Sequence, residues 1–489
     1  MKKDIELMEK RPSIRKDSRV SEVAVTNWNA VIVAGLISAL NAVENSVIGI
    51  GEWPYMSEID REATAIFFGY ATSASKCAHA IFAMIFSIWS YKSQSVRIPL
   101  LSSRFISLAA CCLYLSVEYF PSGRRYVMVT VYILLGIANS ACTVLRAYIA
   151  MFSTDRDRSK AFATIGMSIV VSIIVGPLLQ LIFSAIPYPG FQVLPGIKFH
   201  IYSAPIWFSF FLSIVSVFVC FFFLHDAEKD RTKGEDDSMN SDLDRPAMFS
   251  IEKALIAFKK LRQSSMDWRL IFVCLICKVG GTFSHATMSI FSIILMVQYG
   301  WSGAETVQVG SIIMISFGLI SCTVLMFYIF GNLGTLIPQQ YVYLIATIAS
   351  GSVYLITYPY ALTSSPVAVY NETTRSGCNP LTYSWCDTAM AANPWLFIII
   401  IIALSSPSIP LMHTSLDTIY SKILGNVDQS IGQGAMVVID DVVFMVTPVF
   451  VTEFFTHYGV GPLWIAKSAI FYFLTFVWFI NLDRITPHM

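Results

Sequence analysis

Apolar residues gather along this chain in long runs, each close to the length of a helix that crosses a lipid bilayer. Such a helix needs about 20 consecutive, mostly apolar residues. Short polar segments separate the runs, as loops separate the spans of a polytopic protein. Windows of this length predict twelve membrane-spanning helices at 27–51, 64–90, 99–119, 126–151, 161–186, 201–224, 269–297, 305–330, 338–359, 394–416, 430–453 and 462–481.

A polar stretch, residues 225–267, divides these predicted helices into two groups of six. Its first part is rich in acidic residues between 235 and 244 and buries too little apolar surface to fold alone. Its second part repeats apolar residues at helical spacing from Ile251 to Leu261, which predicts an amphipathic helix at the membrane surface. We therefore expect a tail, a six-helix bundle, a central loop, a second six-helix bundle and a short tail, at 1–26, 27–224, 225–267, 268–481 and 482–489.

Composition agrees with an all-α polytopic membrane protein. Of the 489 residues, 55% are hydrophobic and 13% are charged, and the mean hydropathy is +0.63. A soluble domain has about 25% charged residues, so this chain has too few to cover a surface in water. The net charge of +1 does not point to nucleic acid as a partner. The bilayer is the partner we expect, with the chain acting as a monomer.

Motifs of soluble enzymes are missing from the sequence. It has no Walker-type Gly-rich loop, no HExxH zinc motif and no GxSxG nucleophile elbow. Eight of the ten cysteines lie inside apolar runs, where free cysteines pack as small apolar side chains. We interpret the CxxC pair Cys274 and Cys277 in the same way. We therefore expect no enzymatic activity, no cofactor and no metal site.

The remaining two cysteines, Cys378 and Cys386, lie in the polar loop after the ninth predicted helix. In an oxidising lumen they would form a disulfide, and two free thiols are the alternative. The same loop holds the one N-x-[ST] sequon, Asn371-Glu372-Thr373, whose acceptor Asn371 would be glycosylated on the lumenal or extracellular side. Both signals place this loop outside the cytoplasm.

The Lys and Arg residues of the short loops give the same orientation. Cytoplasmic loops of membrane proteins carry the excess of positive charge. If both termini are cytoplasmic, that side receives the larger share: Lys92, Arg97, Arg156, Arg158, Lys160, Lys422 and Arg484. The opposite side then has Arg61, Arg124, Arg125, Lys198 and Arg375. We therefore expect the N- and C-termini in the cytoplasm.

Ionisable residues inside the predicted helices are the candidates for function, because a charge at membrane depth is costly and usually faces a cavity or a partner. Three cations balance three acids: Lys76, Arg146 and Lys278 against Glu44, Asp440 and Asp441. His285 lies on the helical face of Lys278. Such a balance suits ion pairs that rearrange during transport, and equally a network with a purely structural role.

Each of these charges has an alternative interpretation. Glu44 shares a helical face with Asn41 and Asn45, so it either lines a cavity or is protonated and bonds to its neighbours. Arg146 either projects into a cavity or extends to the nearby membrane surface. Asp440 and Asp441 point about 100° apart on one helix, so they cannot serve one partner equally.

Several runs resemble the major facilitator superfamily. The two groups of six helices, the long central loop, Gly176-Pro177 in the fifth predicted helix and the basic loop 155–160 are typical of that family. Other runs resemble a lysosomal, ceroid-lipofuscinosis-type branch of it: 53–55 (WPY), 145–148 (LRAY), 419–425 (IYSKILG), Gly377-Cys378 and Trp385-Cys386. Tyr132 replaces an Arg that many members have, which indicates a diverged paralogue.

The resemblance implies that helices one, four, seven and ten line a central cavity and that helices two and eleven face each other. Lys76 would then meet Asp440 or Asp441, while Glu44, Arg146, Lys278 and His285 line the path.

On this basis we expect a transporter of a small solute or ion that works by alternating access, with Glu44 or the Asp pair as the coupling carboxylate. The alternatives are an anion channel lined by the three cations and a non-transporting scaffold or sensor. The resemblance implies a lysosomal or late endosomal membrane, with the plasma membrane as the alternative.

Overall fold

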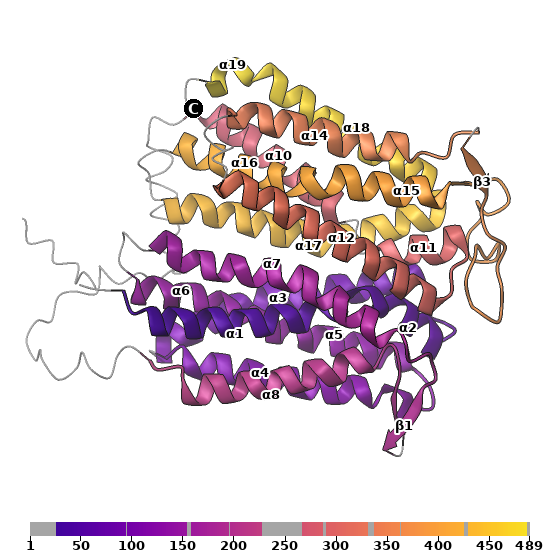
Figure 1. Ribbon diagram of the computed structural model, residues 1–489, viewed down its shortest axis with the longest axis horizontal. Coiled ribbons are helices and arrows are strands. Elements are labelled where there is room, and N and C mark those ends of the chain that lie inside the picture. The colour runs from indigo at the N-terminus through magenta and orange to yellow at the C-terminus, as the bar shows by residue number, and fades with distance from the viewer. Residues whose placement is uncertain are drawn as a thin grey trace, which may run out of the picture.

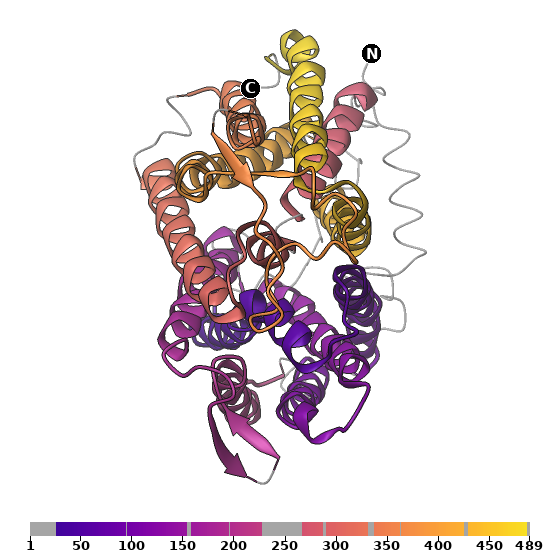
Figure 2. The same cartoon turned by 90° about the vertical axis from the view of Figure 1, so that its right-hand side faces the viewer.

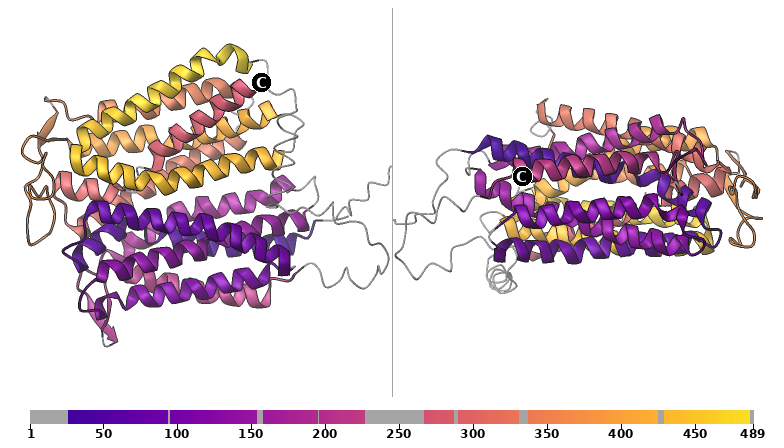
Figure 3. Two further views of the ribbon diagram at one scale, coloured as in Figure 1. Left: turned by 180° about the vertical axis from the view of Figure 1, so that it is seen from behind. Right: turned by 90° about the horizontal axis from the view of Figure 1, so that it is seen from below.

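Helices running in nearly the same direction form two groups that lie side by side (Figures 1 and 3). The structure is a computed structural model, and it describes residues 26–93, 95–153, 158–194, 196–226, 267–286, 290–330, 337–361, 363–424 and 429–486. The predicted amphipathic helix of the central loop lies outside the described residues. The boundaries that we predict for the five parts of the chain stay a prediction.

The N-terminal group contains most of the first half of the chain. Its helices are α1 Trp28–Ser46, α2 Glu52–Ile59, α3 Ala65–Ser93, α4 Arg97–Leu115, α5 Arg124–Ser140, α6 Cys142–Phe152, α7 Arg158–Phe183 and α8 Ala204–Phe222, with short 3-10 turns η1 Gly49–Gly51 and η2 Val117–Tyr119. A hairpin of β1 Phe191–Leu194 and β2 Ile197–Phe199 projects from one end (Figure 2). Within the group, α1 packs on α7 and α8, and α5 packs on α3 and α4.

The C-terminal group is built in the same way. Its helices are α10 Trp268–Ala286, α11 Phe291–Tyr299, α12 Gly303–Phe330, α14 Gln339–Ile356, α15 Pro394–Ile400, α16 Ser406–Leu424, α17 Gln429–Tyr458, α18 Val460–Ile480 and α19 Leu482–Ile485, with a π-helix, η4 Ile401–Ser405. A second small sheet pairs β3 Ser364–Pro366 with β4 Met390–Ala392. Helix α14 packs on α16 and α18, and α10 packs on α17.

Nine helical segments of the described chain are long and apolar enough to cross a membrane, judged by length and composition. Three further segments, α10 with α11, α14 and α17, complete two sets of six and pack against those nine. Large apolar side chains such as Phe211 and Phe272 are 59% and 64% exposed, which suits contact with lipid and not with water. The predicted all-α polytopic fold is confirmed.

Four of the predicted spans are interrupted rather than continuous. The first passes from α1 through η1 into α2, the fourth divides into α5 and α6, the seventh leaves the α-helical conformation at Ile290 before α11, and the tenth contains the π-helix η4. At the fourth, the hydroxyl groups of Ser140 and Thr143 donate to carbonyl oxygens three residues earlier, at 2.7 and 2.8 Å. Such bonds compete with the regular helix ladder, and hydropathy windows do not detect them. These are the four spans expected to line the central cavity.

The two groups share an apolar core at one end. This end carries the Cys378–Cys386 disulfide and is called here the disulfide end; the opposite end, near Asn27 and Ile485, is the terminal end (Figure 1). At the disulfide end one cluster joins both groups and includes Trp53, Tyr55, Phe291, Phe455 and Trp464. Toward the terminal end, the described residues form two separate apolar clusters, one in each group. The described groups are therefore joined at the disulfide end and divided at the terminal end.

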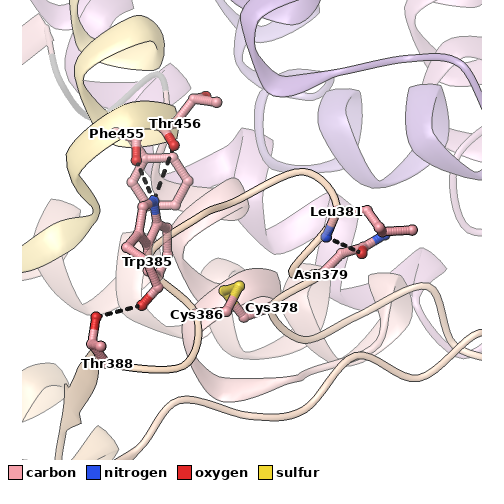
Figure 4. The surroundings of a disulfide bond; sticks show 8 residues. All are labelled: Cys378, Asn379, Leu381, Trp385, Cys386, Thr388, Phe455 and Thr456. Atoms are coloured by element: carbon pink, nitrogen blue, oxygen red, sulfur yellow. Dashed lines mark hydrogen bonds between the residues drawn. A yellow bond between two sulfur atoms is a disulfide. The ribbon is translucent and has the colours of Figure 1, made fainter.

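A loop between α14 and α15, residues 357–393, covers the disulfide end and is called here the disulfide loop. Cys378 and Cys386 form a disulfide within it, with their Cα atoms 5.6 Å apart (Figure 4). The indole N–H of Trp385 donates to the carbonyl oxygens of Phe455 and Thr456, both at 3.1 Å. These bonds attach the loop to the last turn of α17.

The same loop reaches across to the N-terminal group. The guanidinium of Arg375 donates to the carbonyl oxygen of Ser57 at 3.0 Å and to that of Glu58, both on α2. Nearby, the side chain of Asn371 is exposed, and its amide oxygen accepts the N–H of Thr373 at 2.9 Å. The disulfide loop thus connects the two groups and presents the predicted acceptor Asn371 on its outer surface.

A charged cluster stabilises the disulfide end of the N-terminal group, outside the membrane-spanning helices. The carboxylate of Glu118 lies 2.8 Å from the ammonium of Lys198 and 3.2 Å from Nε2 of His200. Because the N–H of Tyr202 donates to Nδ1 of His200, it is Nε2 that donates to Glu118. Burial would raise the pKa of Glu118, but the hydrogen bonds from His200 and Lys198 outweigh it and lower the pKa to about 2.

We predict that replacing Gly69 by valine separates the two groups at the disulfide end. A Cβ at Gly69 of α3 would lie 2.9 Å from the carbonyl oxygen of Pro448 on α17 and closer still to the Thr452 hydroxyl. Distances between spin labels at Tyr119 and Leu381, exposed positions of the two groups, should increase in the variant. Gly166→Val is the control, because a Cβ at Gly166 meets nothing within 4 Å. Unchanged distances in Gly69→Val would contradict the prediction.

We also predict a specific pH dependence for the Glu118→Gln variant. A carboxyl whose pKa falls from 4.5 to about 2 on folding contributes stability that is present above about pH 4.5 and is lost as the pH falls toward 2. At pH 7 the variant should be less stable than the wild type by up to about 3 kcal/mol. Thermal unfolding of the purified chain from pH 7 to pH 2 measures this difference, which should shrink below pH 4.5. Glu372→Gln, an exposed acid on the disulfide loop, should show no such trend.

Candidate functional site

Two cations of the N-terminal group lie at mid-helix positions facing the other group. Lys76 of α3 and Arg146 of α6 are both exposed, although each lies within a membrane-spanning helix. The ammonium of Lys76 lies 5.9 Å from the ring centroid of Phe444 on α17. Helices α3 and α17 pack together, so Lys76 lies at the boundary between the two groups. Neither cation has an acid within 4.0 Å among the described residues.

The C-terminal group contributes a cation held between two acids. The ammonium of Lys278 on α10 lies 3.0 Å from the carboxylate of Asp440 on α17 and 3.5 Å from that of Asp417 on α16. The hydroxyl of Thr282 donates to the other oxygen of Asp440 at 2.6 Å. The Lys278 side chain is 5% exposed, whereas that of Asp417 is 46% exposed. One buried cation is thus shared by two carboxylates that differ in their access to solvent.

Asp441 faces a different set of partners from its neighbour Asp440. The positive charges that act on Asp441 are those of Lys76 and Arg146, from the other group, while Asp440 pairs with Lys278. This division follows from the angle of about 100° between adjacent side chains on a helix. Of the two acids expected to meet Lys76, Asp440 does not, because it is already paired within its own group. Asp441 is the acid on which the charge of Lys76 acts.

Together these residues make up what we call the central polar site: Lys76, Arg146, Lys278, Asp417, Asp440 and Asp441. They come from α3 and α6 of one group and from α10, α16 and α17 of the other. Three cations and three carboxylates therefore meet at the boundary between the groups. Such an arrangement can bind a charged solute, and it can exchange ion-pair partners when protons or solutes arrive.

Glu44 does not belong to this site, in contrast to the expectation that it lines the path. It is 2% exposed and faces the interior of the N-terminal group. Its carboxylate lies 3.1 Å from the guanidinium of Arg104 on α4 and accepts hydrogen bonds from the hydroxyls of Ser107 and Ser213, the latter at 2.9 Å. A second N–H of Arg104 donates to the carbonyl oxygen of Ala138 at 3.0 Å. This buried ion pair links α1, α4, α5 and α8.

The side chain of His285 lies outside the described residues. Its predicted position along the path therefore stays a prediction.

Three charged residues within the helices, Arg104, Asp417 and Lys467, were not among the sequence-based candidates. Arg104 lies five residues into a predicted helix, where a basic residue can be explained by contact with the membrane surface. Asp417 follows the predicted end of the tenth helix at residue 416, whereas α16 continues to Leu424. Lys467 lies near the start of the last helix. Extending the tenth predicted helix until a clear polar loop begins would have included Asp417, whereas Arg104 and Lys467 already lay inside predicted helices and only had to be counted among the charges.

Two groups of six helices, joined at one end and enclosing charged residues at their boundary, define a polytopic membrane transporter. The chain belongs to the Major Facilitator Superfamily, whose sequence model matches residues 31–388. It is 24% identical over 484 residues to Major facilitator superfamily domain-containing protein 8 from Xenopus laevis, which covers 92% of this chain and 91% of that protein. The resemblance to the superfamily and to this branch, as a diverged relative, is confirmed.

Solved structures show the same fold. The D-xylose-proton symporter has a TM-score of 0.62 at 10% identity, covering 92% of this chain and 97% of the symporter. A bacterial homolog of the human lysosomal transporter Spinster, in an inward-facing and unoccupied conformation, has a TM-score of 0.58 at 12% identity, covering 94% and 97%. The human organic anion transporter MFSD10 has a TM-score of 0.54 at 12% identity, covering 92% and 99%. At these identities the likeness concerns the fold, and the chain is a membrane transporter rather than an enzyme.

We predict that Arg104→Met destabilises the protein by about 3–5 kcal/mol, because it leaves the buried carboxylate of Glu44 without its cation. The double variant Glu44→Gln/Arg104→Met should recover much of this loss, since no uncompensated charge then remains. Thermal or chemical unfolding of the purified chain measures both. Arg61→Met, which removes an exposed cation, should change stability by less than about 0.5 kcal/mol. If Arg104→Met were as stable as the wild type, the ion pair of Glu44 and Arg104 would have no stabilising role.

Proposed function

We propose that this protein is a secondary transporter that moves a small solute through the central polar site by alternating access. The observation that carries the proposal is the combination of two features. Charges within the helices of both groups are accessible, Lys76 and Arg146 in one and the partly exposed Asp417 in the other, and a shared apolar core lies at the disulfide end alone among the described residues. In such an arrangement the site is reached from the terminal end. Separating the groups at the disulfide end and joining them at the terminal end would reverse the access.

The ion pairs of the C-terminal group support a coupling role for Asp440 and Asp417. Lys278 is buried and needs a counter-charge, which two carboxylates supply. When one of them is protonated, Lys278 keeps the other, so a proton can bind without leaving the cation unpaired. Asp417 is the more exposed carboxylate, which gives protons a route to the pair. Glu44 is not proposed for this role, because its carboxylate is enclosed by Arg104 and two serines.

The free cations of the site support a solute with a negatively charged or strongly polar group. Lys76 and Arg146 are exposed and have no acid within 4.0 Å among the described residues. A negatively charged group between them and the C-terminal group would be attracted to both cations. Asp441 sets a limit on this attraction, since its own charge acts on the same two residues.

We further propose that the terminal end faces the cytoplasm and that the protein resides in a late endosomal or lysosomal membrane. The distribution of Lys and Arg, the exposed sequon at Asn371 and the disulfide of the disulfide loop support the orientation. The compartment is supported by the resemblance to the lysosomal branch of the superfamily. Loss of a mass shift on glycosidase treatment in the Asn371→Gln variant tests the orientation directly.

We predict that Asp440→Asn abolishes transport while the protein still folds and reaches its membrane. The amide cannot take up a proton in exchange for its charge, so the ion pair with Lys278 is lost permanently. Metabolite profiling of purified lysosomes from cells that lack the protein names the cargo that accumulates. In these cells, wild type should restore the profile, and so should Asp387→Asn, which changes an exposed acid on the disulfide loop. Asp440→Asn should leave transport lower by a factor of about 10 or more.

Two results would contradict this function. Equal restoration by Asp440→Asn and wild type would exclude the coupling role of Asp440. A steady current through enlarged endolysosomes that Arg146→Ala alters would instead identify an anion channel, because a carrier of this type conducts little steady current.

A further inference from the structure

Lys467 of α18 is a buried basic residue that is not part of the central polar site. It is 5% exposed, and its side chain lies among aromatic rings. The ammonium donates to the hydroxyl of Tyr354 on α14 at 3.1 Å. It also lies 4.3 Å from the ring centroid of Tyr354 and 5.2 Å from that of Trp464. Lys467 is thus held by one neutral hydrogen bond and two aromatic faces.

No acid neutralises this cation within the described part of the chain. Its ammonium has no carboxylate within 4.0 Å there, in contrast to the buried cations Lys278 and Arg104, each of which has at least one. Aromatic faces attract a cation only modestly, and a buried unpaired charge is strongly disfavoured. A charged Lys467 therefore needs a negative charge that the described residues do not supply.

A cavity lies directly beside Lys467. It is enclosed by α11, α14, the α15–η4 segment and α18, and has a volume of about 20 Å³. Aromatic and aliphatic side chains form most of its wall, among them Tyr354, Phe397 and Trp464, and Lys467, Thr357 and Ser405 add polar groups. A cavity of this size holds one particle about as large as a water molecule. None of the residues of the central polar site lines it.

The π-helix η4 forms one side of this cavity. It ends at Ser405, whose side chain lines the cavity, as does Ile401 at its start. A π-helical turn is less favourable than an α-helical one and is found mostly at functional sites. The widened turn is therefore a second, independent feature that points to an occupant.

We propose that this cavity is a binding site for one monatomic monovalent anion, a halide ion. The anion would supply the negative charge that Lys467 lacks, which a water molecule cannot do. The hydroxyl of Ser405 and the positive edges of the surrounding aromatic rings suit an anion as well. Its binding would hold α11 and η4 against α14 and α18, and so would stabilise the C-terminal group.

Thermal unfolding of the full chain in lipid nanodiscs tests this site. The chain is compared in sodium gluconate, chloride, bromide and formate at equal ionic strength, because gluconate is too large for the cavity. Chloride or bromide at several times its Kd should raise the Tm by about 2–4 °C over gluconate. A shift with formate and with neither halide would contradict a halide site of this size. If the Tm of the wild type is the same in all of these anions, the proposal is overturned.

Two variants separate the site from general salt effects. Lys467→Met should lose the anion-dependent shift, whereas Lys92→Met, which removes an exposed cation at the end of α3, should keep it. The same shift in Lys467→Met would overturn the proposal. If Lys467→Met does not fold, bromide anomalous diffraction from the wild type decides: a peak beside the Lys467 ammonium supports the site, and its absence from a map that resolves this side chain refutes it.

Discussion

Lipid cannot solvate a charge, and the interior of this protein depends on that constraint. Each buried ionisable side chain needs a partner supplied by the protein or by what the protein binds. Arg104 and Glu44 satisfy one another inside the N-terminal group, with two serine hydroxyls completing the carboxylate's hydrogen bonds. Lys278 has two carboxylates. Lys76 and Arg146 have no such partner among the described residues and are exposed at the boundary between the groups. The distribution of partners thus separates the charges that hold the bundle together from those free to meet a solute.

The packing of the two groups gives that distinction a direction. One apolar cluster joins them at the disulfide end, and separate clusters stabilise each of them toward the terminal end of the described chain. The disulfide loop reinforces the joined end, since Trp385 attaches it to α17 and Arg375 attaches it to α2. Because each group keeps its own core, the two can change their mutual contact without unfolding. A transporter with alternating access requires this property.

The interrupted helices lie in the four spans that we expect to line the central cavity. Regular helices satisfy their own backbone groups and are stable in lipid, whereas a break exposes backbone groups that need other partners. Breaks are tolerated where protein or water surrounds them. The π-helix η4 shows a further use of this freedom, because it borders the cavity beside Lys467 and not the central polar site. Helix irregularity in the C-terminal group is therefore not confined to the central polar site.

The sequence by itself determined the number and order of the helices, their division into two groups, the polar loop that contains Cys378 and Cys386, and the depth of most buried charges. It did so because a bilayer requires about 20 apolar residues per span, which makes hydropathy a direct measure of structure. Only the tertiary structure decided which charges meet. Glu44 pairs with Arg104 rather than lining the path, Asp440 pairs with Lys278 rather than Lys76, the partly exposed Asp417 joins that pair, and Lys467 is buried without an acid beside it among the described residues. A sequence gives the depth of a side chain along its helix, but its partner depends on the rotation and neighbours of that helix, which packing alone determines.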